Sequence, residues 1–261
     1  MKRTGFGGSW TEDKLRIVRA YLIAYRTIFT GNEKAKFLRT IYVDAFAHTG
    51  QRTSRGEMIV QEPLFSAEDE PQLQAFFKGS VRNALELDSP FDHYVFIEKN
   101  QIAFRELEKT VSEYPLRSTE TLLGDANEVL SRWCAQTDWK RNRAVVFLDP
   151  FGMQVEWPLL ETLAKTKGID LWMLFPVSTV LRTLPNAGEP PKEWAERLTK
   201  TFGTEDWKNE FYSTQESITL FEDEETLYRD ADIERVQAFV VSRLTEIFVG
   251  VSPKPMILKN S

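Results

Sequence analysis

Apolar residues recur along the chain in short runs, and stretches of helical periodicity separate these runs. The clearest run is 144–148 (AVVFL), which has no polar face and is typical of a central parallel strand covered on both sides. Further predicted strands are 41–43, 93–97, 120–123 and 169–175. Predicted helices lie at about 102–114, 128–135 and 157–166. This alternation predicts an α/β fold with a Rossmann-like, mostly parallel sheet that carries helices on both faces.

We place the Rossmann-like core at residues 37–180. The segments before and after it have other sequence patterns. Apolar residues at three- and four-residue steps predict an amphipathic N-terminal helix over 10–30, with Thr11 as its N-cap. Prolines and two tryptophan-bearing helical stretches predict a helical insertion over 185–230. The last segment, 231–261, predicts a helix and a short strand at 255–258, so we expect a single domain that stops before its final strand.

Composition narrows the class of protein. Of 261 residues, 42 % are hydrophobic and 28 % are charged, which is typical of a folded globular domain. A single cysteine and two histidines argue against a disulfide framework or a Cys/His zinc cluster. The sequence has neither an apolar run of membrane-spanning length nor an apolar signal core, so we expect a cytoplasmic protein without a membrane partner.

The net charge of -6 hides an asymmetry. Residues 1–60 hold 11 Lys and Arg against 5 Asp and Glu, whereas the rest of the chain is strongly acidic. A basic region of this kind is compatible either with a solvated helix face or with binding to nucleic acid phosphates.

Four carboxylates lie where predicted parallel strands give way to loops: Asp44, Glu98, Asp125 and Asp149. Each acid alone could be a helix N-cap, but ligands of open α/β sheets bind at this edge, where the strand order reverses. For an adenosine-containing cofactor, Glu98 has the position to accept the ribose hydroxyls, and Asp125 with the amide of the next residue could read an adenine edge.

Two further loops complete this prediction. Ala47, Thr49 and Gly50 form a small-residue loop that lets a ligand approach the backbone. Asp149-Pro150-Phe151-Gly152 would face the other side of the pocket, where an acceptor would lie. We predict a mobile lid over 51–75, with Arg52 and Arg55 able to meet phosphate.

Several segments together resemble a known family. YVDAFAHTG at 42–50, FIEKN at 96–100, GDAN at 124–127 and FLDPFG at 147–152 are similar to the three-Cys-motif partner (TcmP) proteins. That family is similar in turn to class I S-adenosylmethionine-dependent methyltransferases, and its members are named for an iron–sulfur partner with three cysteines. The family loop usually has glycine where this chain has His48.

The resemblance implies a methyltransferase that uses S-adenosylmethionine. The predicted cofactor-binding residues are Asp44, Phe46, Ala47, Gly50, Glu98, Lys99, Asp125, Ala126 and Asn127. The predicted catalytic residues are Asp149, Pro150, Phe151 and Gly152. Asp-Pro-Phe-Gly also resembles a motif of tRNA guanine-N2 dimethyltransferases, in which the acid and the proline carbonyl accept hydrogen bonds from an exocyclic amine and the aromatic ring stacks on the base.

Two other functions are open at this stage. The four strand-end acids could bind Mg²⁺ or Mn²⁺ in a metal-dependent phosphodiesterase or nuclease. The small-residue loop after the first strand argues against this function, because a metal site does not need a close approach to the backbone there. The chain could also be a non-catalytic partner of a three-cysteine iron–sulfur protein. Cys134 lies on a predicted helix, and we expect it in the core rather than as a nucleophile.

Overall fold

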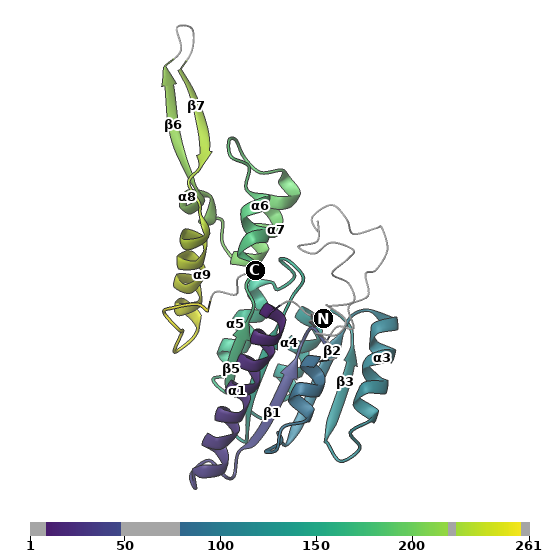
Figure 1. Ribbon diagram of the computed structural model, residues 1–261. Coiled ribbons are helices and arrows are strands. Elements are labelled where there is room, and N and C mark those ends of the chain that lie inside the picture. Colours follow the sequence, from purple (N-terminus) through teal and green to yellow (C-terminus); the bar gives the residue numbers. More distant parts are fainter. Residues whose placement is uncertain (1–8, 48–78, 219–222, 257–261) are drawn as a thin grey trace, which may run out of the picture.

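A parallel sheet forms the centre of the molecule. The computed structural model describes residues 9–47, 79–218 and 223–256. The strands are β1 (Arg39–Asp44), β2 (His93–Glu98), β3 (Thr119–Leu123), β4 (Asn142–Leu148) and β5 (Ile169–Met173). All neighbours in the order β3-β2-β1-β4-β5 are parallel (Figure 1). This arrangement confirms the predicted α/β, Rossmann-like fold.

Helices connect the strands and extend the chain beyond them. They are α1 (Ser9–Gly31), α3 (Gln101–Ser112), α4 (Ala126–Gln136), α5 (Trp157–Lys165), α6 (Val177–Thr183), α7 (Lys192–Phe202), α8 (Trp207–Phe211) and α9 (Ile233–Ile247). Residues 79–85 are also helical and precede β2. The N-terminal helix begins at Ser9, so Thr11 lies inside the helix and is not its cap.

Alternation along each strand divides the core into two layers. Ile41 and Val43 of β1 pack with α4 and α5, whereas Tyr42 between them packs with α1 and the helix at 79–85. Val18 and Leu22 are the buried positions of α1 that cover this second face. Because both faces are covered, the central strands carry few polar side chains.

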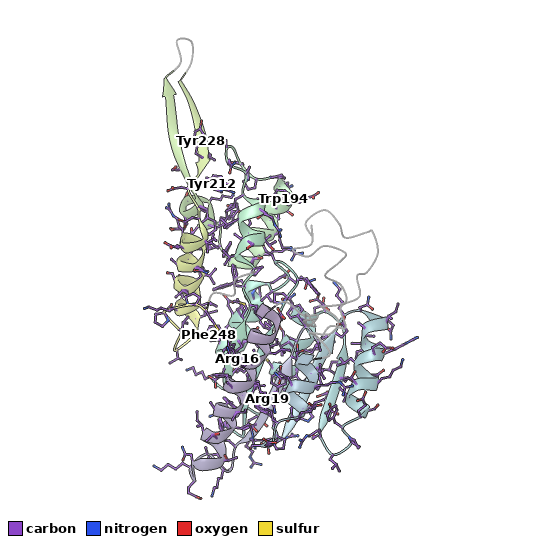
Figure 2. The ribbon with its side chains drawn as sticks, viewed as in Figure 1. Arg16, Arg19, Trp194, Tyr212, Tyr228 and Phe248 are labelled. Carbon is purple, nitrogen blue, oxygen red and sulfur yellow. The ribbon has the colours of Figure 1, made fainter. Side chains whose placement is uncertain are left out.

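The segment at 185–230 departs from the prediction of a helical insertion. Helices α7 and α8 are present, but β6 (Tyr212–Ile218) and β7 (Asp223–Arg229) form an antiparallel hairpin that projects from the body (Figure 1). Tyr212 and Tyr228 lie toward its base (Figure 2). Polar residues with strand propensity, such as Thr214 and Thr226, alternate here, and neither strand has the three-to-four-residue apolar spacing of a helix.

The end of the chain gives no further strand within the described residues. Helix α9 packs on α6 and α8, and Pro255 and Met256 are not in a strand, while the rest of the predicted 255–258 strand lies outside the described residues. Among the residues described, β5 has β4 as its one neighbour in the sheet. None of the described helices is long and apolar enough to cross a membrane.

Candidate functional site

The strand order places a switch point at the carboxyl edge of the sheet. From β1 the chain first adds β2 and β3 on one side and then crosses to β4 and β5 on the other. Asp44 ends β1 and Asp149 follows β4, so the two acids lie at the ends of the two strands that meet at the switch point. Open α/β sheets bind ligands at such a point.

Side-chain alternation gives three of the acids a common face. Asp44 follows Tyr42 by two residues, Glu98 follows Phe96, and Asp149 follows Phe147, and these three aromatic residues belong to one hydrophobic cluster. Since side chains on a strand repeat every second residue, the acids point toward the same layer. The structure supports this for two of them, because burial and then the charges of Asp44 and Asp149 raise the pKa of Tyr42.

Asp44 is buried and held on both oxygens. Its side chain is 1 % exposed. The amide of Phe46 donates to Oδ1 at 3.2 Å, and Ser80 Oγ donates to Oδ2 at 3.2 Å. The carboxylate therefore fixes the turn after β1 and joins it to the helix at 79–85.

Glu98 is the second buried carboxylate and ends the neighbouring strand β2. It is 1 % exposed, and the amide of Asn100 donates to its Oε1 at 2.5 Å. Asn100, not Glu98, caps α3, since its Oδ1 accepts from the amides of Ile102 and Ala103. Capping the following helix therefore does not explain why an acid is buried at this position.

The backbone after β1 runs close to Glu98. The amide of Ala47 donates to the carbonyl of Ile97 at 2.9 Å, which continues the β1–β2 pairing past the end of β1. Phe46 and Ala47 are both buried. The predicted residues Asp44, Phe46, Ala47 and Glu98 are thus brought together.

Asp125 caps a helix, which is the structural role that any of the four strand-end acids could have had. It is the N-cap of α4, and its Oδ1 accepts from the amide of Asn127 at 2.9 Å. Lys99 Nζ lies 3.4 Å from its Oδ2 in a partly exposed ion pair. Ala126, the first residue of α4, is buried. Asp125 and Ala126 follow the end of β3, beyond Glu98 from the switch point.

Asn127 links the α4 N-terminus to the loop after β4. Its Nδ2 donates to Asp125 Oδ1 at 3.1 Å and to the carbonyl of Gln154 at 2.9 Å, and its Oδ1 accepts from the amide of Glu156 at 2.9 Å. Its amide group is therefore occupied by contacts within the protein. Arg197 of α7 lies 3.4 Å from Glu156 Oε1, so the insertion is tied to the same loop.

The Asp149–Gly152 segment forms a turn above the switch point. The Phe151 amide donates to Gln154 Oε1 at 3.1 Å, and Gly152 has a φ of 65°, a conformation that favours glycine. Phe151 is half-buried and is not a core member of the three clusters that the described residues form.

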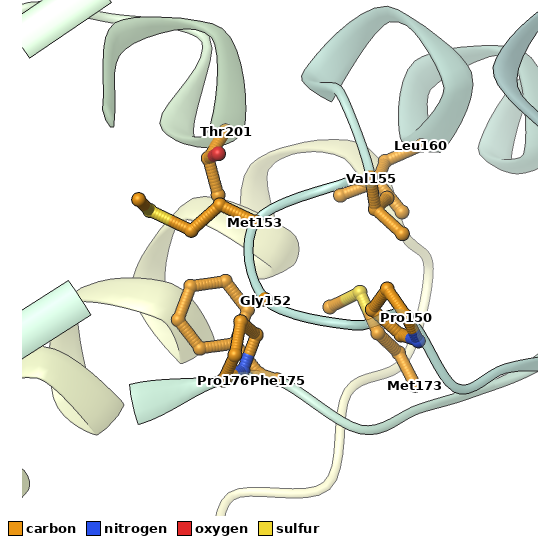
Figure 3. A pocket seen from close by; sticks show the side chains of 9 residues that line it. All are labelled: Pro150, Gly152, Met153, Val155, Leu160, Met173, Phe175, Pro176 and Thr201. Atoms are coloured by element: carbon orange, nitrogen blue, oxygen red, sulfur yellow. The ribbon is translucent and has the colours of Figure 1, made fainter. Parts of the chain in front are cut away.

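A small cavity lies behind this turn (Figure 3). It is lined by Pro150, Gly152, Met153, Val155, Leu160, Met173, Phe175, Pro176 and Thr201. Its volume of about 10 Å³ is what one water molecule needs, so it is too small for a nucleoside.

Other predicted residues lie outside the described part of the chain. These are His48, Thr49, Gly50 and the predicted lid at 51–75 with its two arginines. Ser80, Gln154 and Glu156 were not predicted. Ser80 is 36 residues from Asp44 in sequence, and only the fold brings the two together.

Comparison with protein-family models, characterised proteins and solved structures finds no match. The resemblance to three-Cys-motif partner proteins therefore stays a prediction from the sequence. Within the described ranges, no three His, Cys, Asp or Glu side chains are grouped so that they could hold a metal ion.

Proposed function

We propose that the carboxyl edge binds S-adenosylmethionine and that the chain is a methyltransferase acting on an amine, for which a nucleic acid base is the acceptor we favour. The observation that carries the proposal is the pair of buried carboxylates, Asp44 and Glu98, on adjacent strands beside the switch point. Two buried carboxylates at neighbouring strand ends on one sheet edge exceed what the fold requires, and this edge is where open α/β sheets bind ligands.

The residues present fit an adenosine ligand. Glu98 would accept hydrogen bonds from the ribose hydroxyls, as the acid at the end of the second strand does in dinucleotide-binding sheets. The Ala126 amide at the start of α4 would face the adenine, next to Asp125. Asp44 would hold the turn after β1 in place through the Phe46 amide, so that the backbone meets the amino-acid part of the cofactor.

The loop after β4 would hold the acceptor. When bound, S-adenosylmethionine supplies an electrophilic methyl group. The Asp149 carboxylate and the Pro150 carbonyl would accept hydrogen bonds from the amine and orient its lone pair. Phe151, which is half-buried, would stack on the attached base. Asn127 and Gln154 keep this loop in one conformation.

Calorimetric titration with S-adenosylhomocysteine tests the cofactor site. We expect saturable binding without added metal that is lost in Glu98→Gln, because an amide nitrogen replaces an oxygen that would accept from the ribose hydroxyls. Binding should be only weakened in Asp44→Asn, which changes one of the two oxygens that hold the turn after β1. Both amide variants keep an oxygen for the backbone amide that each acid binds, so the fold is preserved. Glu113→Gln, which alters a surface ion pair with Arg82, is the matched control and binds normally. No binding by the unaltered chain would refute the proposal.

Asp149→Ala tests the acceptor site separately. We expect it to bind S-adenosylhomocysteine with unchanged affinity and to lose methyl transfer. If the unaltered chain binds the cofactor but transfers methyl groups to no acceptor, the result would favour the role of a non-catalytic partner. Binding or phosphodiester cleavage that requires Mg²⁺ or Mn²⁺ would favour the metal-dependent alternative.

A further inference from the structure

The opposite, amino edge of the sheet carries a row of cations. Arg39 is the first residue of β1, Arg141 directly precedes β4, and Lys167 lies two residues before β5. The Arg39 amide donates to the Arg141 carbonyl at 2.8 Å. The carbonyl of Gly168, which follows Lys167, accepts from the amide of Ala144 in β4 at 2.9 Å. Three neighbouring strands, about 4.8 Å apart, thus begin beside a positive charge. We call Arg39, Arg141 and Lys167, with Lys140, the cation row.

The cation row faces water and is not neutralised. All four side chains are exposed. The ion pairs among described residues place no carboxylate on any of them, although Lys36 nearby pairs with Glu33. Asp138 and Asp92 also lie at this edge, but their described contacts are with the Lys140 amide and with Thr40 and Arg26. The cation row is thus a local positive feature of a chain whose net charge is -6.

Lys167 occupies its place against a backbone preference. Its φ is 52°, and it is the one non-glycine residue with a positive φ in the described part of the chain. It directly follows Thr166, the C-cap of α5, a position where glycine is usual because side chains disfavour the left-handed conformation. Its side chain is exposed and takes part in none of the described hydrogen bonds or ion pairs, so the strain points to a use outside the fold.

An aromatic ring lies at one end of the row. Phe37, two residues before Arg39, is 72 % exposed, and Ile28 near the end of α1 is 60 % exposed. The end of α1 and the start of β1 meet at the lower side of the molecule, away from the carboxyl edge (Figure 1). Exposed cations in line with an exposed ring are the pattern of single-strand sites, where cations follow the phosphates and a ring stacks on a base.

We propose that the amino edge binds the backbone of a single-stranded nucleic acid, with the cation row on successive phosphates and Phe37 on a base. The proposal does not depend on the cofactor site. A row along strand starts fits one phosphodiester chain better than a surface of lipid headgroups, since the charges are arranged in a line. Cations also interact favourably with helix C-termini, which lie at this edge, and the variants below separate that role from binding.

Fluorescence anisotropy with a labelled 20-nucleotide poly-dT or poly-U strand tests the proposal over a range of KCl concentrations. Four phosphate contacts predict that log K falls with log[KCl] with a slope of about -3, at roughly 0.7 for each contact. Arg141→Gln and Lys167→Gly should each weaken binding several-fold and reduce the slope by about 0.7. Phe37→Ala should weaken binding with the slope unchanged. Lys192→Gln on α7 is the control and should bind normally.

Lys167→Gly gives the sharpest result, because stability and binding should move in opposite directions. Glycine relieves the left-handed strain, so the urea midpoint should rise while affinity falls. No binding by the unaltered chain, or unchanged affinity in both cation variants, would overturn the proposal. Variants that lose stability and keep their affinity would show that the cations serve the helix termini. Binding to phosphatidylserine vesicles instead of the oligonucleotide would also overturn it.

Discussion

The Asn127 bridge can be tested by removing its side chain amide. Asn127→Ala deletes two donated bonds, to Asp125 Oδ1 and to the Gln154 carbonyl, and one accepted bond from the Glu156 amide. Each such bond contributes about 1 kcal/mol net, and the group is half-buried, so water can replace part of the loss. We expect the free energy of unfolding to fall by about 2–3 kcal/mol.

The assay should measure local order as well as global stability. Urea unfolding gives the free energy, and hydrogen exchange gives the protection of amides 150–156. In Asn127→Ala the Phe151 and Glu156 amides should exchange faster, because the loop loses its link to α4. Asn127→Asp keeps an acceptor for Glu156 but loses both donors and places a charge beside Asp125, so it should recover at most part of the stability.

Asn83→Ala is the matched control. Asn83 also joins two segments, since its Nδ2 donates to the Leu15 carbonyl at 3.0 Å and its Oδ1 accepts from Arg19 at 3.2 Å. It should lose about 1–2 kcal/mol without changing exchange in 150–156. A loss below about 0.5 kcal/mol in Asn127→Ala, the size of an ordinary surface substitution, would refute the bridge, as would unchanged exchange in the loop.

Three further predictions concern the body of the fold. Gly203→Ala should lower the free energy of unfolding by about 2–4 kcal/mol, since φ is 70° and the new Cβ would lie 2.2 Å from the Trp157 ring. Gly188→Ala is the control: its φ is 77° and no atom lies within 4 Å of the new Cβ, so the free energy should fall by only about 1 kcal/mol in the same urea titration. Burial raises the pKa of Cys134 to about 12, so iodoacetamide at pH 8 should label it only in denaturant, and labelling of the native chain at the rate of a free thiol would contradict its core position. Burial, and then the charge of Arg39, lower the pKa of His93, so the unfolded chain binds more protons than the folded chain. Stability should therefore fall as the pH drops below about 6.5. The variant His93→Gln should flatten this part of the curve of urea midpoint against pH.

The sheet was predictable from the sequence because its strands are buried on both faces. The run AVVFL at 144–148 forms the last five residues of β4, and the acids placed at strand ends do lie at one edge. The hairpin was not predictable in the same way, since the sequence of neither strand contains an apolar run that would mark it by hydrophobicity.

The candidate site was predictable in position but not in its internal contacts. Asp44 and Glu98 could be placed by counting strand ends, whereas the Ser80 hydroxyl reaches Asp44 only through the packing of a helix 36 residues later. Asn127 fits a cofactor-binding motif, yet its amide is used to join two loops. Local sequence gives the type of a polar residue, and the tertiary fold decides which partner it meets.

The β6–β7 hairpin has a consequence for how the molecule opens. At its base, the Gly188 amide donates to the Leu227 carbonyl at 2.8 Å and the Arg229 amide donates to the Asn186 carbonyl at 3.0 Å, so a third segment supports the ribbon there. Farther out, the described backbone pairing is that of two strands with each other. A two-stranded ribbon alone is marginal in water, so its outer rungs should unzip and re-form as a separate cooperative unit while the parallel sheet stays closed.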